Sequence, residues 1–276
     1  MSHGSNPTLA YLYRKYLARQ LLNNVKAGRF LEIGVGSGAF YEVLESRGFR
    51  GLCLDLNPRL IEEHRSRQIS SKQRIRFAAQ DFFTLEETFD LVVAFEVLEH
   101  YREDTVCLRK WSEMLNPGGL LLISVPAHMR QWTSNDTRAG HARRYEKTEL
   151  KTKLLEQGFQ ILRCWCYGFP ILNWTYPLSQ SLAPGTVSSP PESTATELVE
   201  GNPARSLNLP ASSSQLQNSR EFLANFSRTA DSGTRRFGWM SCWVFHEVLW
   251  WPFLQIQKPF LSSDLGIGYL VKCQRG

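Results

Sequence analysis

The amino-acid sequence predicts an α/β fold with a doubly wound, mostly parallel sheet of seven strands and a C-terminal insertion before the last strand. Two observations support this fold class. Short apolar runs alternate with segments of helical periodicity, which is typical of strands joined by crossover helices. The runs 91–95 and 120–123 contain only apolar residues, as expected of parallel strands that helices cover on both faces.

The first element is a helix over 11–25, where apolar side chains recur at helical spacing. The elements that follow in chain order are strand 29–33, helix 39–47, strand 51–54, helix 58–67, strand 75–78, strand 89–95, helix 103–115, strand 120–125, helix 147–156 and strand 160–165. Gly48 closes the second helix, since glycine commonly ends helices.

The last third of the chain interrupts this alternation. In 184–231 small and polar residues replace aromatic and β-branched ones, so this region cannot offset its ordering entropy and we predict a mostly disordered insertion. An aromatic helix is predicted over 237–256, ended or kinked at Pro252, and a last strand over 266–273. The predicted units are an N-terminal helical segment (1–28), a core (29–168), an insertion or cap (169–265) and the last strand of the core sheet (266–276).

Composition excludes several classes of protein. The 276-residue chain has a net charge of +6, and its basic residues gather locally instead of forming a continuous surface, so we expect no nucleic-acid partner. Its six cysteines form no CxxC pair and no His stands at ligand spacing, so we expect neither a disulfide framework nor a metal site. The polar N-terminus lacks the apolar segment of a secretory signal, so we expect a cytoplasmic protein.

A glycine turn, Gly34-Val35-Gly36-Ser37-Gly38, runs from the first strand into a helix. Glycine lets the backbone approach a ligand closely, and the helix N-terminus offers unpaired N–H groups. Asp55 ends the second strand about 20 residues further on, where a carboxylate can accept bonds from ribose hydroxyls. These features alone fit either a nicotinamide dinucleotide or another adenosine-containing cofactor.

Five motifs in order separate these alternatives: 31–38, Asp55, 80–82 (Gln-Asp-Phe), the strand 89–95 with Glu-Val-Leu-Glu-His after it, and 115–119 (Leu-Asn-Pro-Gly-Gly). With them the sequence resembles the class I S-adenosylmethionine-dependent methyltransferase superfamily, which has a Rossmann-like fold. The resemblance implies S-adenosylmethionine as cofactor. The residues that it implies for binding are Glu32, Gly34, Gly36 and Gly38 at the methionine end, Asp55 and Leu56 at the ribose, Asp81 and Phe82 at the adenine, and Phe95 and Glu96 on the floor of the site.

A second resemblance extends over Gly-His-Ala-Arg-Arg-Tyr at 140–145 and Leu-Leu-Glu-Gln-Gly-Phe at 154–159. Similar stretches occur in small-molecule methyltransferases related to the ubiquinone-biosynthesis O-methyltransferases, in which the segment lies over the mouth of the active site. The candidates for substrate contact are therefore His128, His141, Arg144 and Tyr145, with His100 as a further one. Alternatively, Arg143 and Arg144 pair with Glu146 and Glu149 on a solvated surface, and Glu99 and His100 begin a helix.

The resemblance implies methyl transfer to a small, apolar or lipid-like molecule. The sulfonium is already activated, so the protein mainly positions the acceptor, and an oxygen acceptor additionally needs a base. We expect His141 to be that base, with His128 as the second choice. The helix 237–256 would cap an apolar site or contact a membrane surface, because His246 and Glu247 make a membrane span costly. The alternatives are an NAD(P)-dependent oxidoreductase and a module that binds S-adenosylmethionine without turnover.

Overall fold

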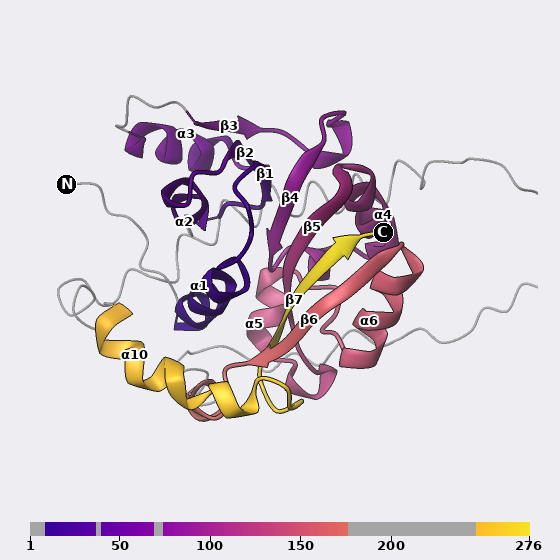
Figure 1. Ribbon diagram of the computed structural model, residues 1–276. Coiled ribbons are helices and arrows are strands. Elements are labelled where there is room, and N and C mark those ends of the chain that lie inside the picture. Colours follow the sequence, from indigo (N-terminus) through magenta and orange to yellow (C-terminus); the bar gives the residue numbers. More distant parts are fainter. Residues whose placement is uncertain (1–8, 37–39, 69–73, 176–246) are drawn as a thin grey trace, which may run out of the picture.

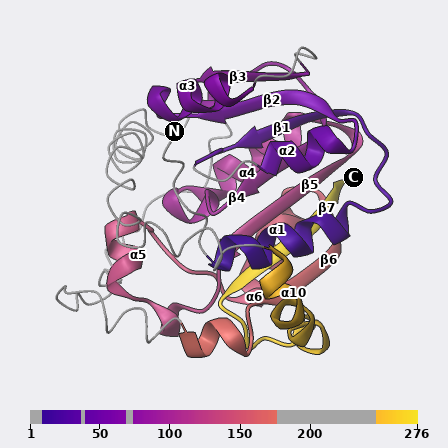
Figure 2. The same cartoon turned by 90° about the vertical axis from the view of Figure 1, so that its left-hand side faces the viewer.

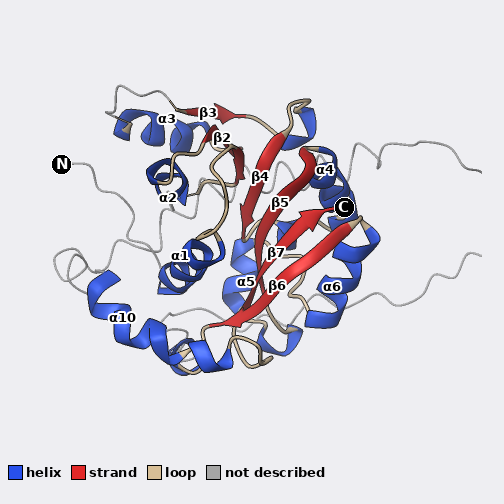
Figure 3. Cartoon of the chain, viewed as in Figure 1, coloured by secondary structure: helices blue, strands red, loops and turns tan. Residues whose placement is uncertain are grey.

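The computed structural model describes residues 9–36, 40–68, 74–175 and 247–276. Within them, seven strands form one sheet in the order β3-β2-β1-β4-β5-β7-β6 (Figure 3). The strands are β1 (Arg29–Ile33), β2 (Arg50–Asp55), β3 (Ile75–Ala79), β4 (Phe89–Phe95), β5 (Leu115–Pro126), β6 (Phe159–Tyr167) and β7 (Gly268–Arg275). The predicted fold class, a doubly wound α/β sheet of seven strands, is confirmed.

The direction of the strands divides the sheet into two parts. β1, β2, β3, β4 and β5 pair in parallel, whereas β7 pairs antiparallel with both β5 and β6. Because β7 lies between β5 and β6, it is an interior strand of the sheet. The strand order reverses between β1 and β4, and open α/β sheets bind their ligands at such a switch point, beyond the carboxyl ends of the strands.

Helices cover both faces of the sheet, and each face has its own apolar core (Figures 1 and 2). On one face lie α1 (Leu9–Leu21), α2 (Phe40–Ser46), α3 (Pro58–Arg67) and α10 (Glu247–Ile256), and on the other α4 (Asp104–Glu113) and α6 (Lys147–Glu156). The short helix α5 (Ser134–Ala139) lies beyond the carboxyl end of β4. Trp111 of α4 is fully buried on the second face. α10 lies beside α1, where the Gln255 side chain donates to the Tyr16 hydroxyl at 2.6 Å.

Two predicted boundaries are clearly wrong, and one helix was not predicted. The first helix ends at Leu21, four residues before the predicted 25. β5 begins at Leu115, because Phe89 pairs with Leu115 before Leu91 pairs with Leu120, so the predicted Asn-Pro-Gly-Gly turn is a bulge within the strand. The six-residue helix α5 has no apolar periodicity and was not expected; its signal is the capping box of Thr133 and Asp136.

The predicted aromatic helix is described from Glu247, and it continues through Pro252 to Ile256, so proline does not end it. The predictions for 184–231, for 237–246 and for Gly38 lie outside the described residues. No helix among the described residues is long and apolar enough to cross a membrane.

Candidate functional site

The glycine turn after β1 lies at the switch point of the sheet. Gly34 and Gly36 have φ values of 73° and 53°, a backbone conformation that is strongly disfavoured for residues with a Cβ atom. A Cβ atom on Gly34 would also lie 2.7 Å from a methyl carbon of Val97. The turn therefore requires glycine at these positions and leaves its backbone open to a ligand.

Two side chains hold this turn in place. The Asp55 carboxylate accepts the N–H of Gly36 at 2.9 Å and that of Asn57 at 2.8 Å. On the other side a ring nitrogen of His64 lies 2.8 Å from the Gly36 carbonyl oxygen, and the second nitrogen lies 3.0 Å from the Tyr41 hydroxyl. Because a carbonyl only accepts, Nε2 carries the proton and Nδ1 accepts from Tyr41. Asp55 was predicted from its spacing, whereas His64 was not.

Glu32 is the second-last residue of β1, just before the turn, and is buried. Burial raises the pKa of Glu32 to about 8, even though the backbone N–H groups of Tyr41 and Phe40 favour the ionised form. Its Oε2 atom has no hydrogen-bond partner among the described residues. A buried carboxyl with a free oxygen can accept from an ammonium group or a water that enters the crevice.

Asp81 and Phe82, the residues predicted at the adenine, make contacts within the protein. The Asp81 carboxylate accepts the N–H of Phe83 at 2.9 Å and caps the short helix Phe82–Thr84. The Phe82 ring is buried against Tyr101 and Trp111, and the adenine contact expected at this position stays a prediction. Phe83, the next residue, is only half-buried and is the better candidate for that contact.

A buried ion pair lies at the carboxyl end of β4. The Arg14 guanidinium of α1 is 3.1 Å from the Glu96 carboxylate, which also accepts the hydroxyl groups of Ser124 at 2.8 Å and Tyr167 at 3.5 Å. The Glu96 charge holds the pKa of Arg14 above its usual value in spite of burial. Arg14 also lies over the Phe95 ring, 5.6 Å from its centroid. This network joins α1 to the floor of the crevice, and Arg14 was not predicted.

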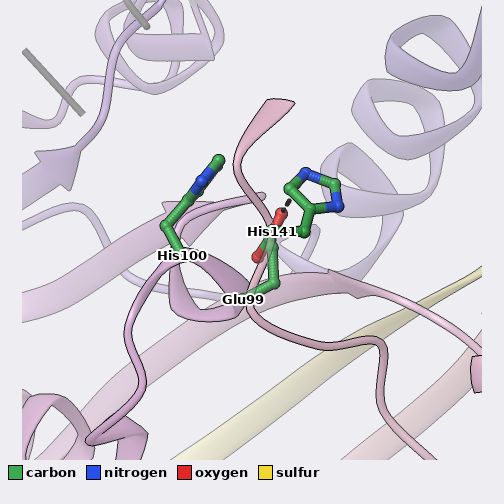
Figure 4. A group of neighbouring side chains, drawn as sticks. All are labelled: Glu99, His100 and His141. Atoms are coloured by element: carbon green, nitrogen blue, oxygen red, sulfur yellow. Dashed lines mark ion pairs between the residues drawn. The ribbon is translucent and has the colours of Figure 1, made fainter. Parts of the chain in front are cut away.

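Glu99, His100 and His141 form a cluster beyond the same strand (Figure 4). His141 Nδ1 donates to Asp136 at 2.9 Å, and its Nε2 lies 3.7 Å from Glu99. Glu99 is fully buried, neither of its oxygens has a hydrogen-bond partner among the described residues, and burial raises the pKa of this carboxyl well above its usual range. Burial and the nearby His141 lower the pKa of His100 to about 3.

This cluster has two chemical uses. Asp136 fixes the tautomer of His141, so the unprotonated Nε2 can act as a base, as in the His–Asp pairs of hydrolases. One ligand atom from each of Glu99, His100 and His141 lies within 4.8 Å of the others, so these residues could also hold a divalent cation. The sequence predicts no metal site and indicates only the first use.

The other predicted substrate contacts are enclosed in the protein. Arg144 is buried and donates from Nε and Nη2 to Asp136, at 2.8 and 2.9 Å, and from Nη1 to the Ala127 carbonyl. Tyr145 is fully buried, and its hydroxyl donates to Asp104 at 2.8 Å. These two residues support the wall of the site from behind, which corrects both the expected substrate contact and the alternative of a solvated Arg144.

His128 belongs to a different group of side chains. Its Nδ1 lies 3.0 Å from Glu146 and its Nε2 lies 3.7 Å from Asp264, a residue of the loop before β7. The two predicted bases therefore have separate partners: His141 contacts Asp136 and Glu99, and His128 contacts carboxylates near β7.

The sheet order, the glycine turn at the switch point and the carboxylate after β2 define the Rossmann-like class of methyltransferase folds. A family model described as a methyltransferase domain matches residues 6–163. The chain therefore belongs to the methyltransferase domain family.

Comparisons with individual proteins agree with this membership. The ubiquinone biosynthesis O-methyltransferase of Xanthomonas oryzae pv. oryzae (strain PXO99A) is 30% identical over 139 residues, which are 49% of this chain and 55% of that protein. The chain thus spans about half the length of the curated relatives it matches.

Two solved structures share the fold at low sequence identity. The Haloferax volcanii complex of the Trm112 methyltransferase activator with a putative methyltransferase has a TM-score of 0.54 at 14% identity, covering 96% of this chain and 90% of that one. Magnesium protoporphyrin IX methyltransferase of Synechocystis PCC 6803 with bound SAH has a TM-score of 0.50 at 18% identity, covering 58% and 78%. At these identities the likeness concerns the fold.

Proposed function

We propose that this protein transfers a methyl group from S-adenosylmethionine to an oxygen atom of a small, apolar or lipid-like molecule. The main observation behind the proposal is the glycine turn at Gly34 and Gly36. It lies at the switch point of the sheet and is held by a hydrogen bond from the Gly36 N–H to the Asp55 carboxylate. Family membership and the named O-methyltransferase relative support methyl transfer, and the SAH in one structural neighbour supports the cofactor.

In this proposal the residues around the turn bind the cofactor. Backbone groups of Gly34 and Gly36 face the methionine portion, the free oxygen of Glu32 accepts from its ammonium group, and Asp55 accepts from ribose hydroxyls. The contribution of the protein is to hold the acceptor in line with the sulfonium and to exclude water, because the cofactor already carries an activated methyl group.

The acceptor oxygen would lie at the cluster of Glu99, His100 and His141. A neutral His141, oriented by Asp136, can remove the proton of a hydroxyl as the methyl group is transferred. Alternatively, a divalent cation held by the three side chains would lower the pKa of the hydroxyl by direct coordination. Chelation distinguishes these two mechanisms. If His141 is the base, activity survives EDTA and the pH profile changes in His141→Gln; if a cation is used, activity is lost with EDTA and returns with a transition-metal ion such as Zn²⁺ or Mn²⁺.

The apolar character of the substrate is supported by α10. Trp251, Phe253 and Ile256 of this helix are exposed, as is Trp174 before the undescribed segment. Tryptophan is favoured where a protein meets the headgroups of a bilayer. We propose that this surface brings the protein to membranes in which a lipid-like substrate dissolves.

The central experiment is incubation of the protein with S-adenosylmethionine labelled in the methyl group and with lipid extract, followed by identification of the labelled product. A labelled methyl ether or ester is expected. Label on nitrogen or carbon would overturn O-methylation. Cofactor binding without any labelled product would favour a module without turnover. Tighter binding of NAD than of S-adenosylmethionine would favour the oxidoreductase.

A further inference from the structure

Three side chains that are distant in sequence converge where β5, β6 and β7 meet. His128 follows β5, Cys166 is in β6, and Asp264 precedes β7. The His128 nitrogen, the Cys166 sulfur and an Asp264 oxygen all lie within 4.8 Å of one another. We infer that these residues form a binding site for Zn²⁺ or a similar transition-metal ion, separate from the methyl-transfer site.

The His128 ring is prepared for metal coordination. Glu146 only accepts hydrogen bonds, so the 3.0 Å contact places the proton of the neutral ring on Nδ1 and leaves the lone pair of Nε2 free. Nε2 has no hydrogen-bond partner among the described residues, although the residue is only 3% exposed. A histidine whose second nitrogen is bonded to a carboxylate is the usual arrangement around protein-bound zinc.

The other two ligands complete a donor set that zinc accepts. His128 Nε2 and Asp264 Oδ1 are 3.7 Å apart, close to the separation of two ligands on a tetrahedral ion with bonds of about 2.0–2.2 Å. The Cys166 sulfur accepts the N–H of Gly266 at 3.1 Å.

The backbone holds the three ligands in this arrangement. The Ala127 N–H donates to the Ile267 carbonyl oxygen at 2.9 Å, and the Ile267 N–H donates to the Tyr167 carbonyl oxygen at 2.9 Å. Backbone hydrogen bonds therefore connect the three segments that carry the ligands. His128 has a φ of 60°, which is strained for a residue with a side chain. Such strain is typical of functional positions, and here the conformation directs the ring toward Cys166 and Asp264.

The charges and the exposure of the site suit a divalent cation. A Cys166 thiolate and the Asp264 carboxylate would supply two negative charges, and Glu146 adds a third behind His128. The Asp264 side chain is 47% exposed, so an ion can enter from solvent, and water can occupy a fourth coordination position. The Tyr269 hydroxyl donates to Asp264 at 2.6 Å and fixes its orientation.

The proposal can be tested with Co²⁺, added to the full chain under a non-thiol reductant. A cobalt–thiolate bond gives a charge-transfer band in the near ultraviolet, which the sulfur-free cluster of Glu99, His100 and His141 cannot produce. We expect this band in the wild type and its loss on addition of Zn²⁺. We also expect its loss in Cys166→Ser and its retention in Cys164→Ser, the control two residues earlier in β6.

Two further variants keep the test decisive if Cys166→Ser does not fold. Asp264→Asn changes an exposed ligand and should weaken Co²⁺ binding at least about tenfold, and Glu146→Gln should weaken it roughly 10–100-fold through the orientation of His128. Absence of a charge-transfer band in the wild type, or a band that survives in Cys166→Ser, would overturn the proposal. In that case His128 would contact the carboxylates of Glu146 and Asp264 without coordinating a metal ion.

Discussion

The Arg14 guanidinium of α1 and the Glu96 carboxylate after β4 form a largely buried ion pair, 3.1 Å apart. The pair ties a helix that precedes the sheet to the point where the strand order reverses. Arg14 also donates to the Tyr167 hydroxyl at 3.3 Å, so three segments meet at one guanidinium. The first turns of α1 are therefore part of the crevice wall.

Glu96→Gln should lower the stability of the ligand-free protein. The substitution leaves the Arg14 charge buried without its carboxylate, and breaking such pairs costs about 3 kcal/mol. We expect that decrease in the free energy of unfolding measured by urea denaturation. As a control, Arg76→Gln removes one side of an exposed pair with Glu87 and should change stability by less than about 1 kcal/mol. Equal changes in the two variants would contradict a special role for the Arg14 pair.

Asp55→Asn should weaken the binding of S-adenosylmethionine. The asparagine amide group cannot accept all the bonds that the carboxylate offers to Gly36, Asn57 and a ribose, and a bond to a charged group contributes about 1.5–3 kcal/mol. We expect Kd, measured by calorimetry, to rise by about tenfold or more.

The matched control for this variant is Asp90→Asn. Asp90 also accepts a backbone N–H, that of Arg29 at 2.7 Å, but it lies near the amino end of β4, whereas Asp55 lies at the carboxyl end of β2. Its replacement should leave Kd unchanged. If both variants bind equally well, the ribose is not held at Asp55.

Glu32→Gln should remove a pH dependence of stability. In the folded protein burial raises the pKa of Glu32 to about 8, against an ordinary value of 4.5, so the native state holds an extra proton between these values. The wild type should therefore lose stability, relative to the variant, as pH rises from about 5 to about 8. The slope of that difference is at most about 1.4 kcal/mol per pH unit.

This difference is measured by denaturation of both proteins across the pH range. The exposed Glu156 of α6 provides the control, and Glu156→Gln should run parallel to the wild type. A Glu32→Gln curve that also runs parallel to the wild type would show that Glu32 is ionised in the fold.

Replacing both Trp251 and Phe253 with serine in one double variant should reduce the association of the protein with lipid vesicles. Both side chains are exposed on α10, so their removal costs little apolar packing within the fold. We expect a lower fraction of the double variant to float with phosphatidylcholine and phosphatidylglycerol vesicles. Leu162→Ser changes an exposed apolar side chain of β6 and serves as the control. Unchanged flotation of the double variant would exclude this surface as the membrane contact.

The sequence predicted the parts of this fold that depend on local apolar pattern. The bounds of β1, β4, α3 and α6 agree with the prediction, because each is a continuous apolar run or a periodic segment between clear boundaries. The turn at Gly34 and its carboxylate were found for a similar reason, since a strand, a turn and a spacing are local features.

Contacts between distant residues could not be predicted in this way. Arg14 looks like any basic residue of an amphipathic helix, and its pairing with Glu96 depends on how α1 crosses the sheet. Arg144 looked like a surface charge because Asp136, its buried partner, lies in the short polar helix α5. The position of His128 beside Cys166 and Asp264 required the antiparallel insertion of β7, which no single segment encodes.

The place of β7 also sets an order of events for newly made chains. Strands β1, β2, β3, β4 and β5 can pair while the protein is still being synthesised, since each needs only segments that have already left the ribosome. β6 has no partner in the sheet until residues 268–275 arrive between it and β5. An early stop before β7, or loss of residues 268–276, would therefore expose two sheet edges at once and leave an aggregation-prone intermediate.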